Sequence, residues 1–318
     1  MTALLFSSYP AVGNPQDDID ELDLENTFLD MHFINGERGW VVGGKGDLRS
    51  TINGGRTWQR HRLGDSALTR VAFLDSKRGW ILSFDGNLFA TKNDGHSWIR
   101  QALPGKWVKA FRFVTPDIGW VIGKKGEIAK TTDGGRHWKE QPADAYFDLN
   151  DIGCFTTDNC IVVGNKGIIR LTTDGGKTWE RIKSPFWDED ISRVFIAADG
   201  TPWALYRASR TVMLYRSSDK GRTWKIANGD LPSLANSLFF WDKMNGIAVG
   251  RGIDLTADGG SSWRGAKVPI NVPVNGVCFI NRKLGWAVGS FKTILHTKDG
   301  GKTWLKQHGE DAQPDPKQ

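Results

Sequence analysis

Long apolar segments are absent from this sequence of 318 residues. No stretch approaches the roughly 18 apolar residues that a membrane-spanning helix needs, so we expect no transmembrane segment. The first residues lack a cationic region and hold only a short apolar run, Ala3 to Phe6, which does not predict a signal peptide. With 39% hydrophobic and 25% charged residues, the composition is that of a globular protein.

Cysteine and histidine are also scarce. Three cysteines are too few for a disulfide-built scaffold, and the six scattered histidines form no zinc-finger spacing with them. The glycine-rich segment Gly43 to Gly46 lies between two expected strands and does not open a helix, so it is not a phosphate cradle. We therefore expect neither a metal nor a cofactor.

Glycine and tryptophan, by contrast, are plentiful. The 38 glycines imply many turns, and the 15 tryptophans imply large packing residues at recurring places. A box of the form Thr/Ser-x-Asp/Asn-x-Gly-x-x-Trp occurs seven times, and consecutive box tryptophans are 39 to 45 residues apart. A period of this length is typical of the four-stranded blades of a β-propeller. The box tryptophans are Trp58, Trp98, Trp138, Trp179, Trp224, Trp263 and Trp304.

Each repeat has the pattern of four short strands, A to D. An apolar alternation such as 70–74 precedes a polar turn and a Gly-Trp strand start, and a glycine-containing turn leads to a third strand. The sequence therefore predicts an all-β fold, a seven-bladed β-propeller with four antiparallel strands per blade and the box turn between strands C and D. Each blade should be complete in chain order. We expect an acidic lead segment (1–27), the propeller (28–308) and a polar tail (309–318).

The box itself has the chemistry of a turn. Its Asp or Asn accepts hydrogen bonds from nearby backbone N–H groups, its glycine supplies positive φ, and its tryptophan covers the turn. Calcium loops are the alternative, but they need several closely spaced oxygen ligands. Each box has one carboxylate at most, and Asn53 and Asn93 replace it in blades 1 and 2. The box is therefore expected to stabilise the fold.

Two cysteines occupy matching places in the fourth repeat. Other repeats place an apolar residue six positions before the glycine that opens strand B, as in Phe33 and Gly39, whereas here Cys154 and Cys160 stand at both positions. A disulfide needs Cα atoms within about 7 Å, which a short hairpin provides. Two unlinked buried thiols are the alternative. A bridge would favour an oxidising compartment.

The seven Thr/Ser-x-Asp/Asn-x-Gly-x-x-Trp boxes resemble the BNR or Asp-box repeat, which also occurs in sialidases. The pairing of the box with a Gly-Trp-aliphatic-x-Gly strand, as in 39–43, 119–123 and 285–289, resembles the photosystem II stability/assembly factor family over about Thr27 to His308. The resemblance implies a non-enzymatic propeller that assists assembly of a membrane complex, usually after export to the thylakoid lumen or periplasm. Related propellers also occur in organisms without photosynthesis.

A sialidase-like glycoside hydrolase or a carbohydrate-binding BNR protein is the alternative function. Sialidase chemistry needs an arginine triad, a Tyr nucleophile with a Glu partner, and an Asp acid. Of four tyrosines, only Tyr206 and Tyr215 lie in expected strands, where packing explains them. The arginine-containing entry motif of sialidases is absent. We therefore expect no catalytic residues.

One face of the propeller should be basic. Because strand A lies nearest the axis, the B-to-C turns and D-to-A connections share a face, and the boxes mark the opposite one. Six of the seven B-to-C turns carry a cation, and blade 2 has Asp85 instead. Aromatic residues outside the repeat registers accompany them, a combination typical of protein interfaces. The predicted partner-binding residues are Lys45, Lys124, Lys125, Lys166, Arg207, Arg210, Arg251, Lys292, Trp107 and Trp187.

The charge balance indicates the kind of partner. A formal charge of +6 and a pI near 9.2 favour an acidic ligand. Nucleic acid is disfavoured because the cations are spread over a ring and no recognition motif is present. We expect a monomer that binds an acidic segment of a protein, and the family resemblance implies a membrane-complex subunit as that protein. A merely solvated rim of lysines is the alternative.

Overall fold

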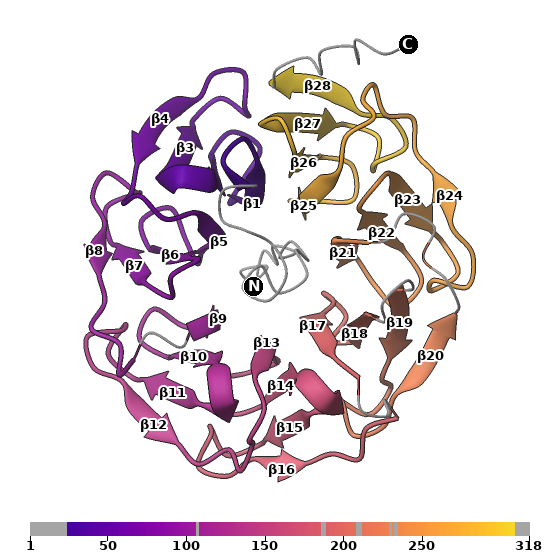
Figure 1. Cartoon of the computed structure of the whole chain (residues 1–318). Helices are drawn as coiled ribbons and strands as arrows, with labels where there is room; N and C mark the ends of the chain where they lie inside the picture. The colour runs from indigo at the N-terminus through magenta and orange to yellow at the C-terminus, as the bar shows by residue number, and fades with distance from the viewer. Residues whose placement is uncertain are drawn as a thin grey trace, which may run out of the picture.

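The computed structural model describes residues 24–105, 108–185, 189–207, 212–228, 231 and 235–308. These residues form seven four-stranded antiparallel sheets arranged as blades around one axis (Figure 1). The predicted seven-bladed, all-β propeller is confirmed. Residues 1–23 and 309–318 lie outside the described residues, so the predicted region boundaries stay predictions.

Four consecutive strands make each blade. Strands A are β1 (Phe28–Phe33), β5 (Leu68–Phe73), β9 (Val108–Phe113), β13 (Leu149–Cys154), β17 (Ile191–Ile196), β21 (Ser237–Phe240) and β25 (Val274–Phe279). Strands B are β2 (Gly39–Gly43), β6 (Gly79–Ser83), β10 (Gly119–Gly123), β14 (Cys160–Gly164), β18 (Pro202–Arg207), β22 (Gly246–Val249) and β26 (Gly285–Gly289). Strands C are β3 (Asp47–Thr51), β7 (Leu88–Thr91), β11 (Ile128–Thr131), β15 (Ile169–Thr172), β19 (Val212–Arg216), β23 (Ile253–Thr256) and β27 (Thr293–Thr297).

Strands D, on the rim, are β4 (Gln59–Arg62), β8 (Ile99–Arg100), β12 (Lys139–Gln141), β16 (Glu180–Arg181), β20 (Lys225–Asn228), β24 (Arg264–Gly265) and β28 (Leu305–His308). Three B-to-C turns contain a single 3-10 turn: η2 (Gly44–Gly46), η3 (Lys124–Gly126) and η4 (Asn165–Gly167). The box tryptophan lies just before strand D. Its indole covers the turn, as in Trp224, whose Nε1 donates to the Gly221 carbonyl at 3.0 Å.

The Gly-Trp pair that opens strand B packs neighbouring blades together. The Phe33 ring lies over Gly39, where an added Cβ would come within 2.6 Å of the ring. The other face of this ring stacks on Trp286 of the preceding blade, with centroids 3.7 Å apart, and the box residue Trp58 meets it edge-on. Glycine is therefore needed because only its missing side chain leaves room for the phenylalanine. The same stacks join Trp40 with Phe73, Trp80 with Phe113, and Trp203 with Phe240.

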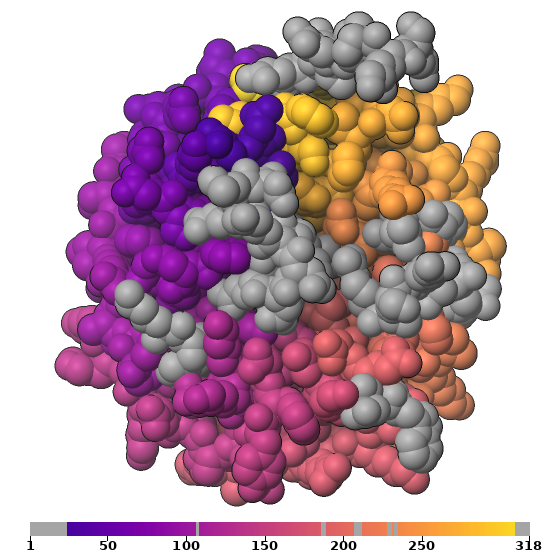
Figure 2. All heavy atoms as spheres, in the orientation of Figure 1, coloured from indigo at the N-terminus to yellow at the C-terminus, as the bar shows by residue number. Residues whose placement is uncertain are grey.

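The ring closes where blade 7 meets blade 1, and no described residue outside β25–β28 adds a strand to the last blade. Figure 2 shows the indigo atoms of blade 1 against the yellow atoms of blade 7. Asp47, almost fully buried, lies 3.2 Å from both Arg49 and Lys292. Burial alone would raise the pKa of Asp47, but hydrogen bonds and charges from Arg49 and Lys292 lower it further than burial raises it. An ionised carboxylate therefore joins the first and last blades.

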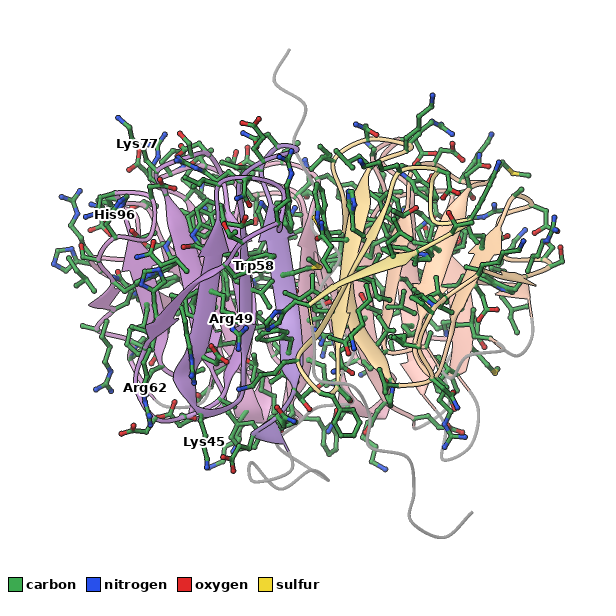
Figure 3. The ribbon with its side chains drawn as sticks, turned by 90° about the horizontal axis from the view of Figure 1, so that it is seen from above. Lys45, Arg49, Trp58, Arg62, Lys77 and His96 are labelled. Atoms are coloured by element: carbon green, nitrogen blue, oxygen red, sulfur yellow. A yellow bond between two sulfur atoms is a disulfide. The ribbon has the colours of Figure 1, made fainter. Side chains whose placement is uncertain are left out.

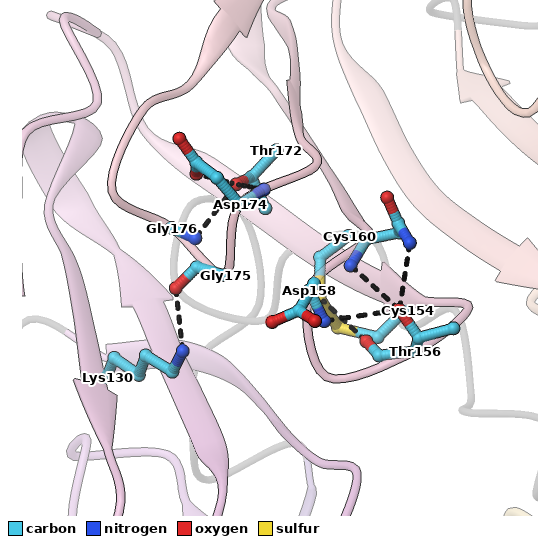
Figure 4. The surroundings of a disulfide bond; sticks show 10 residues. Lys130, Cys154, Thr156, Asp158, Cys160, Thr172, Asp174, Gly175 and Gly176 are labelled. Carbon is cyan, nitrogen blue, oxygen red and sulfur yellow. Dashed lines mark hydrogen bonds between the residues drawn. A yellow bond between two sulfur atoms is a disulfide. The ribbon is translucent and has the colours of Figure 1, made fainter.

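Blade 4 replaces the Phe-over-Gly contact with a disulfide. Cys154 and Cys160 are directly paired across β13 and β14, their Cα atoms are 4.0 Å apart, and their sulfurs are bonded (Figure 4). Both half-cystines are buried in the cluster that contains Trp120 of the preceding blade. The disulfide thus occupies the place that a phenylalanine ring takes in most other blades.

Denatured, unreduced protein is expected to expose one reactive thiol per chain. Among the three cysteines of the sequence, Cys278 is the free one, and burial raises its pKa to about 12, so the folded chain should react very slowly. A thiol titration in denaturant, before and after reduction, should give one and then three thiols. Three thiols before reduction would show that Cys154 and Cys160 are unlinked.

Candidate partner-binding surface

The two faces of the propeller lie as the strand order predicts. Seen from the side in Figure 3, Lys45 and Arg62 lie at one end of the strands, and Lys77 and His96 lie at the other. Lys45 belongs to a B-to-C turn and Arg62 ends a strand D, whereas His96 belongs to a box. We call the first surface, formed by the B-to-C turns and D-to-A connections, the B–C face, and the opposite one the box face.

The B-to-C turns hold their lysines in a recurring backbone conformation. Lys45, Lys125, Lys166 and Lys292 all adopt left-handed conformations, with φ between 51° and 57°. Left-handed backbone is unfavourable for lysine, and in two of these turns a hydrogen bond to the adjacent D-to-A connection helps to hold it. The N–H of Lys125 donates to Asp148 at 2.9 Å, and that of Lys166 donates to Asp190 at 3.0 Å. The turns thereby fix where each lysine side chain leaves the backbone.

The predicted cations differ in what surrounds them. Lys45 contacts the carboxylate of Glu25, and Lys292 is half-buried beside Asp47, so both have acidic partners within the chain. Four other side chains of the predicted set are exposed: Lys124, Lys125, Lys166 and Arg251. Four predicted residues fall wholly or partly outside the described part of the chain: Trp107, Trp187 and Arg210 entirely, and Arg207 for its side chain.

Two exposed aromatic residues stand between the lysine turns of blades 3 and 4. Tyr146 is 82% exposed and Phe147 is 50% exposed, and both belong to the connection from β12 to β13. In the sequence they appear as aromatics outside the repeat registers, but their exposure could not be deduced from it. Exposed tyrosine and phenylalanine beside cations are typical of interface anchors. The structure therefore adds them to the candidate site.

The connection that carries these aromatics is fixed at both ends. On one side, the guanidinium of Arg170 donates to the Ala143 carbonyl at 3.2 Å and to the Asp144 carbonyl at 2.7 Å. On the other side, Asp148 pairs with the buried ammonium of Lys109 at 2.6 Å. Because both ends are held, Tyr146 and Phe147 are presented by an ordered loop, and less ordering entropy is lost on binding.

The carboxylate of Asp148 is charged at neutral pH. Burial would raise its pKa, but the hydrogen bonds from Lys109 and Lys125 and the charges of Lys109 and Lys124 outweigh burial and lower it. This carboxylate already accepts the Lys125 N–H and pairs with Lys109. Lys124, Lys125 and Lys166 are exposed, and the turns that carry them flank the connection with the aromatic pair: Gly126 approaches the Ala145 carbonyl, and the Asn165 N–H donates to the Asp148 carbonyl at 2.9 Å. We call these three lysines and the aromatic pair the blade 3–4 patch.

The boxes on the opposite face use their carboxylates within the turn. In blade 4, Asp174 accepts hydrogen bonds from the Thr178 N–H at 3.0 Å and from the Thr178 hydroxyl at 2.7 Å. Figure 4 shows a further bond of this box, in which the Thr172 hydroxyl oxygen accepts the Gly176 N–H at 2.8 Å. The Thr178 hydrogen bonds lower the pKa of Asp174 to about 2. Within the described ranges, no group of three or more His, Cys, Asp or Glu residues could hold a metal ion.

Charged side chains also meet across the axis of the propeller. Arg70 of blade 2 donates to Asp151 of blade 4 at 2.8 Å, and the other oxygen of Asp151 accepts the Val194 N–H of blade 5 at 3.1 Å. Arg193 lies 4.0 Å from the same carboxylate. Arg70 and Asp151 are almost fully buried, and the Arg193 side chain is 12% exposed. Together they connect three blades. The network is a structural feature of the channel between the innermost strands.

The tyrosines required by the hydrolase alternative pack inside the fold. Tyr206 is buried and Tyr215 is half-buried in the cluster between blades 4 and 5, with their rings 6.4 Å apart. Burial, and then the charge of Glu189, raise the pKa of Tyr215. A tyrosine nucleophile needs the opposite shift, because the phenolate is the attacking species. The described structure gives these tyrosines a packing role.

Similarity to known proteins agrees with this fold. The family model described as photosynthesis system II assembly factor YCF48 matches residues 14–111, 105–230 and 255–316. The chain is also similar to a solved structure of YCF48 from Cyanidioschyzon merolae, at 18% identity and a TM-score of 0.67, over 87% of this chain and 96% of that one. No curated protein matches the chain significantly.

Two further solved structures are similar. One, titled YCF48 bound to D1 peptide, is 21% identical with a TM-score of 0.67, over 87% of this chain and 94% of that one. The other is the GH74 xyloglucanase from Xanthomonas campestris, at 10% identity and a TM-score of 0.68, over 90% of this chain and 55% of that one. At these identities the likeness establishes the shared propeller fold alone.

Across the described residues, no helix has the length and apolar character to span a membrane.

Proposed function

Because the chain belongs to the photosynthesis system II assembly factor YCF48 family, we propose that it is a non-enzymatic protein whose B–C face binds an acidic segment of a protein partner. The observation that carries the proposal is the blade 3–4 patch, in which two turns with three exposed lysines flank a fixed loop with two exposed aromatics. The solved relative with a bound D1 peptide supports a peptide as the kind of ligand, and a membrane-complex subunit as its source.

The two kinds of side chain contribute differently. Exposed ion pairs are worth only about 0 to 1 kcal/mol each, so lysines alone bind weakly and mainly select for carboxylates. Buried aromatic anchors supply the larger part of the affinity in most interfaces. We expect Tyr146 and Phe147 to be covered by apolar side chains of the partner while the lysines pair with its carboxylates. We propose that the surface also includes Arg251, which is exposed. The remaining predicted residues, whose side chains are outside the described part of the chain, belong to the same proposal: Arg207, Arg210, Trp107 and Trp187.

Removing the aromatic pair tests this division of roles. Changing Tyr146 and Phe147 together to alanine is expected to weaken binding of a labelled peptide that holds both acidic and apolar residues by about tenfold or more, because hot-spot truncations cost over about 1 kcal/mol. The melting temperature should stay unchanged, since both side chains are exposed. Fluorescence anisotropy gives the affinity.

A matched control exists on the other face. Ile52 is 71% exposed and lies in a box, so Ile52→Ala removes exposed apolar area without touching the B–C face. The Ile52→Ala variant should bind the labelled peptide with the same affinity as the unchanged chain. If the Ile52 change weakened binding and the Tyr146/Phe147 change did not, the box face would be the working surface.

We also expect no sialidase activity. Tyr206 and Tyr215 are packed in the cluster between blades 4 and 5, and the raised pKa of Tyr215 opposes its activation as a nucleophile. A fluorogenic sialoside should therefore not be hydrolysed above the rate of a heat-denatured sample. Turnover that disappears on Tyr206→Phe or Tyr215→Phe would instead support the hydrolase alternative.

A further inference from the structure

The chain enters the propeller on the B–C face. The residues just before β1 are held by the B-to-C turns of two blades: the Gly44 N–H of blade 1 donates to the Thr27 carbonyl at 3.1 Å, and the Lys292 N–H of blade 7 donates to the Asn26 carbonyl at 3.2 Å. An isolated β-bridge pairs Thr27 with Ser290. Residues 24–27 are therefore part of the same face as the predicted binding residues.

Leu24 anchors this entry on the inner part of the face. Its side chain is buried with Leu29 and Ala67, and Phe84 of the blade 2 B-to-C turn packs against them. A Cβ on Gly44 would collide with the Leu24 carbonyl oxygen, so glycine at that turn permits the close approach. The chain before Leu24 is thereby tethered to the B–C face.

That tethered chain is strongly acidic. Residues 1–25 contain no lysine, arginine or histidine, and all 42 lysines and arginines of the protein follow them. Of the acidic residues in this segment, the structure describes Glu25, which contacts Lys45 of the predicted binding set. The carboxylates of this segment are Asp17, Asp18, Asp20, Glu21, Asp23 and Glu25.

We propose that residues 17–25 are an internal ligand of the B–C face, which occupies its lysines until a partner's acidic segment displaces it. The proposal rests on the proposed function, because it assigns this segment to the same lysines. The charges are complementary, and the Glu25 contact with Lys45 is one such pairing. Residues 17–23 extend up to roughly 24 Å at about 3.3–3.6 Å per residue, and the proposal requires the lysine turns of blades 3 and 4 to lie within this reach of Leu24.

Tethering makes a weak contact effective. A short flexible link gives a segment an effective concentration of the order of millimolar at a nearby site, so a few exposed ion pairs suffice to occupy it. A partner must then bind tightly enough to displace the internal segment. Because carboxylates alone would not achieve this, the face selects segments that also contact Tyr146 and Phe147. Salt should weaken the internal contact as well as partner binding.

The test compares two full-length chains. One is unchanged, and the other carries D17N, D18N, D20N, E21Q and D23N, which keep the side-chain shapes and remove five charges. A labelled peptide with the sequence of residues 14–25 is the probe, added separately to each chain at low salt. We expect it to bind the amide variant at least tenfold more tightly than the unchanged chain, and K124E/K125E/K166E in the amide variant to abolish that binding.

Three outcomes would overturn the proposal. The peptide could bind both chains equally, bind neither, or bind the amide variant regardless of the three lysine reversals. Sedimentation of both chains adds a check: an unchanged chain that dimerises, beside a monomeric amide variant, would place the segment on a second copy instead. If an unrelated acidic peptide with apolar anchors binds both chains alike, the proposed function stands and the internal ligand is wrong. If only the 14–25 peptide binds, and only to the amide variant, the lysines do bind the internal segment, and recognition of a partner through the aromatic pair is wrong.

Discussion

Reversing Lys124, Lys125 and Lys166 to glutamate is expected to weaken the binding of an acidic partner peptide by roughly a hundredfold at low salt. Each exposed ion pair is worth about 0 to 1 kcal/mol, and a reversed charge adds repulsion, so three positions together reach about 3 kcal/mol. The melting temperature should change little, because the three side chains are exposed in turns outside the blade core. The peptide affinity, measured as a function of salt, gives the effect.

The box face supplies a control of equal charge. Lys77, Lys177 and Lys302 are exposed on turns of the opposite face, and their reversal changes the net charge by the same amount. This triple variant should retain most of the affinity and lose only the long-range attraction, which salt screens over about 10 Å at 0.1 M. Equal losses in both variants would mean that net charge alone, and not the blade 3–4 patch, governs binding.

Changing Asp151 to alanine is expected to destabilise the propeller by about 3–5 kcal/mol, the cost of breaking a buried ion pair. Asp151 accepts hydrogen bonds from Arg70 at 2.8 Å and from the Val194 N–H at 3.1 Å, and it is almost fully buried. Burial raises its pKa, although the charge of Arg70 opposes that shift. The intact pair therefore adds little net stability, but its removal leaves the Arg70 charge buried beside a missing partner.

A double variant separates charge from packing. D151L combined with R70M replaces both charges with apolar side chains of similar size, and it should recover much of the stability that D151A loses. Thermal unfolding followed by circular dichroism gives the comparison, with a fall of several degrees expected for D151A. Equal stability of D151A and the unchanged chain would show that the cross-axis contact does not hold blades 2, 4 and 5 together.

The architecture is encoded locally, which is why the sequence alone predicts it. The box turn closes through contacts within four residues, such as the Gly176 N–H with Thr172, and each repeat carries the same residues. The Phe and Gly of one hairpin lie six residues apart, so two cysteines at these positions in blade 4 predict that Cys154 and Cys160 are cross-strand neighbours. Turn chemistry also placed the recurring lysines on one face.

Only the tertiary structure decided which charged side chains meet. Lys292 contacts Asp47, which lies 245 positions away in the sequence, and Arg70 contacts Asp151, which lies 81 positions away. No periodic pattern of the sequence encodes such pairs. The fixed loop that presents Tyr146 depends on Arg170 of the next blade. Local spacing determines strands and turns, because their hydrogen bonds join near neighbours. Closing the ring brings distant side chains together, and that closure determines which charges pair within the chain.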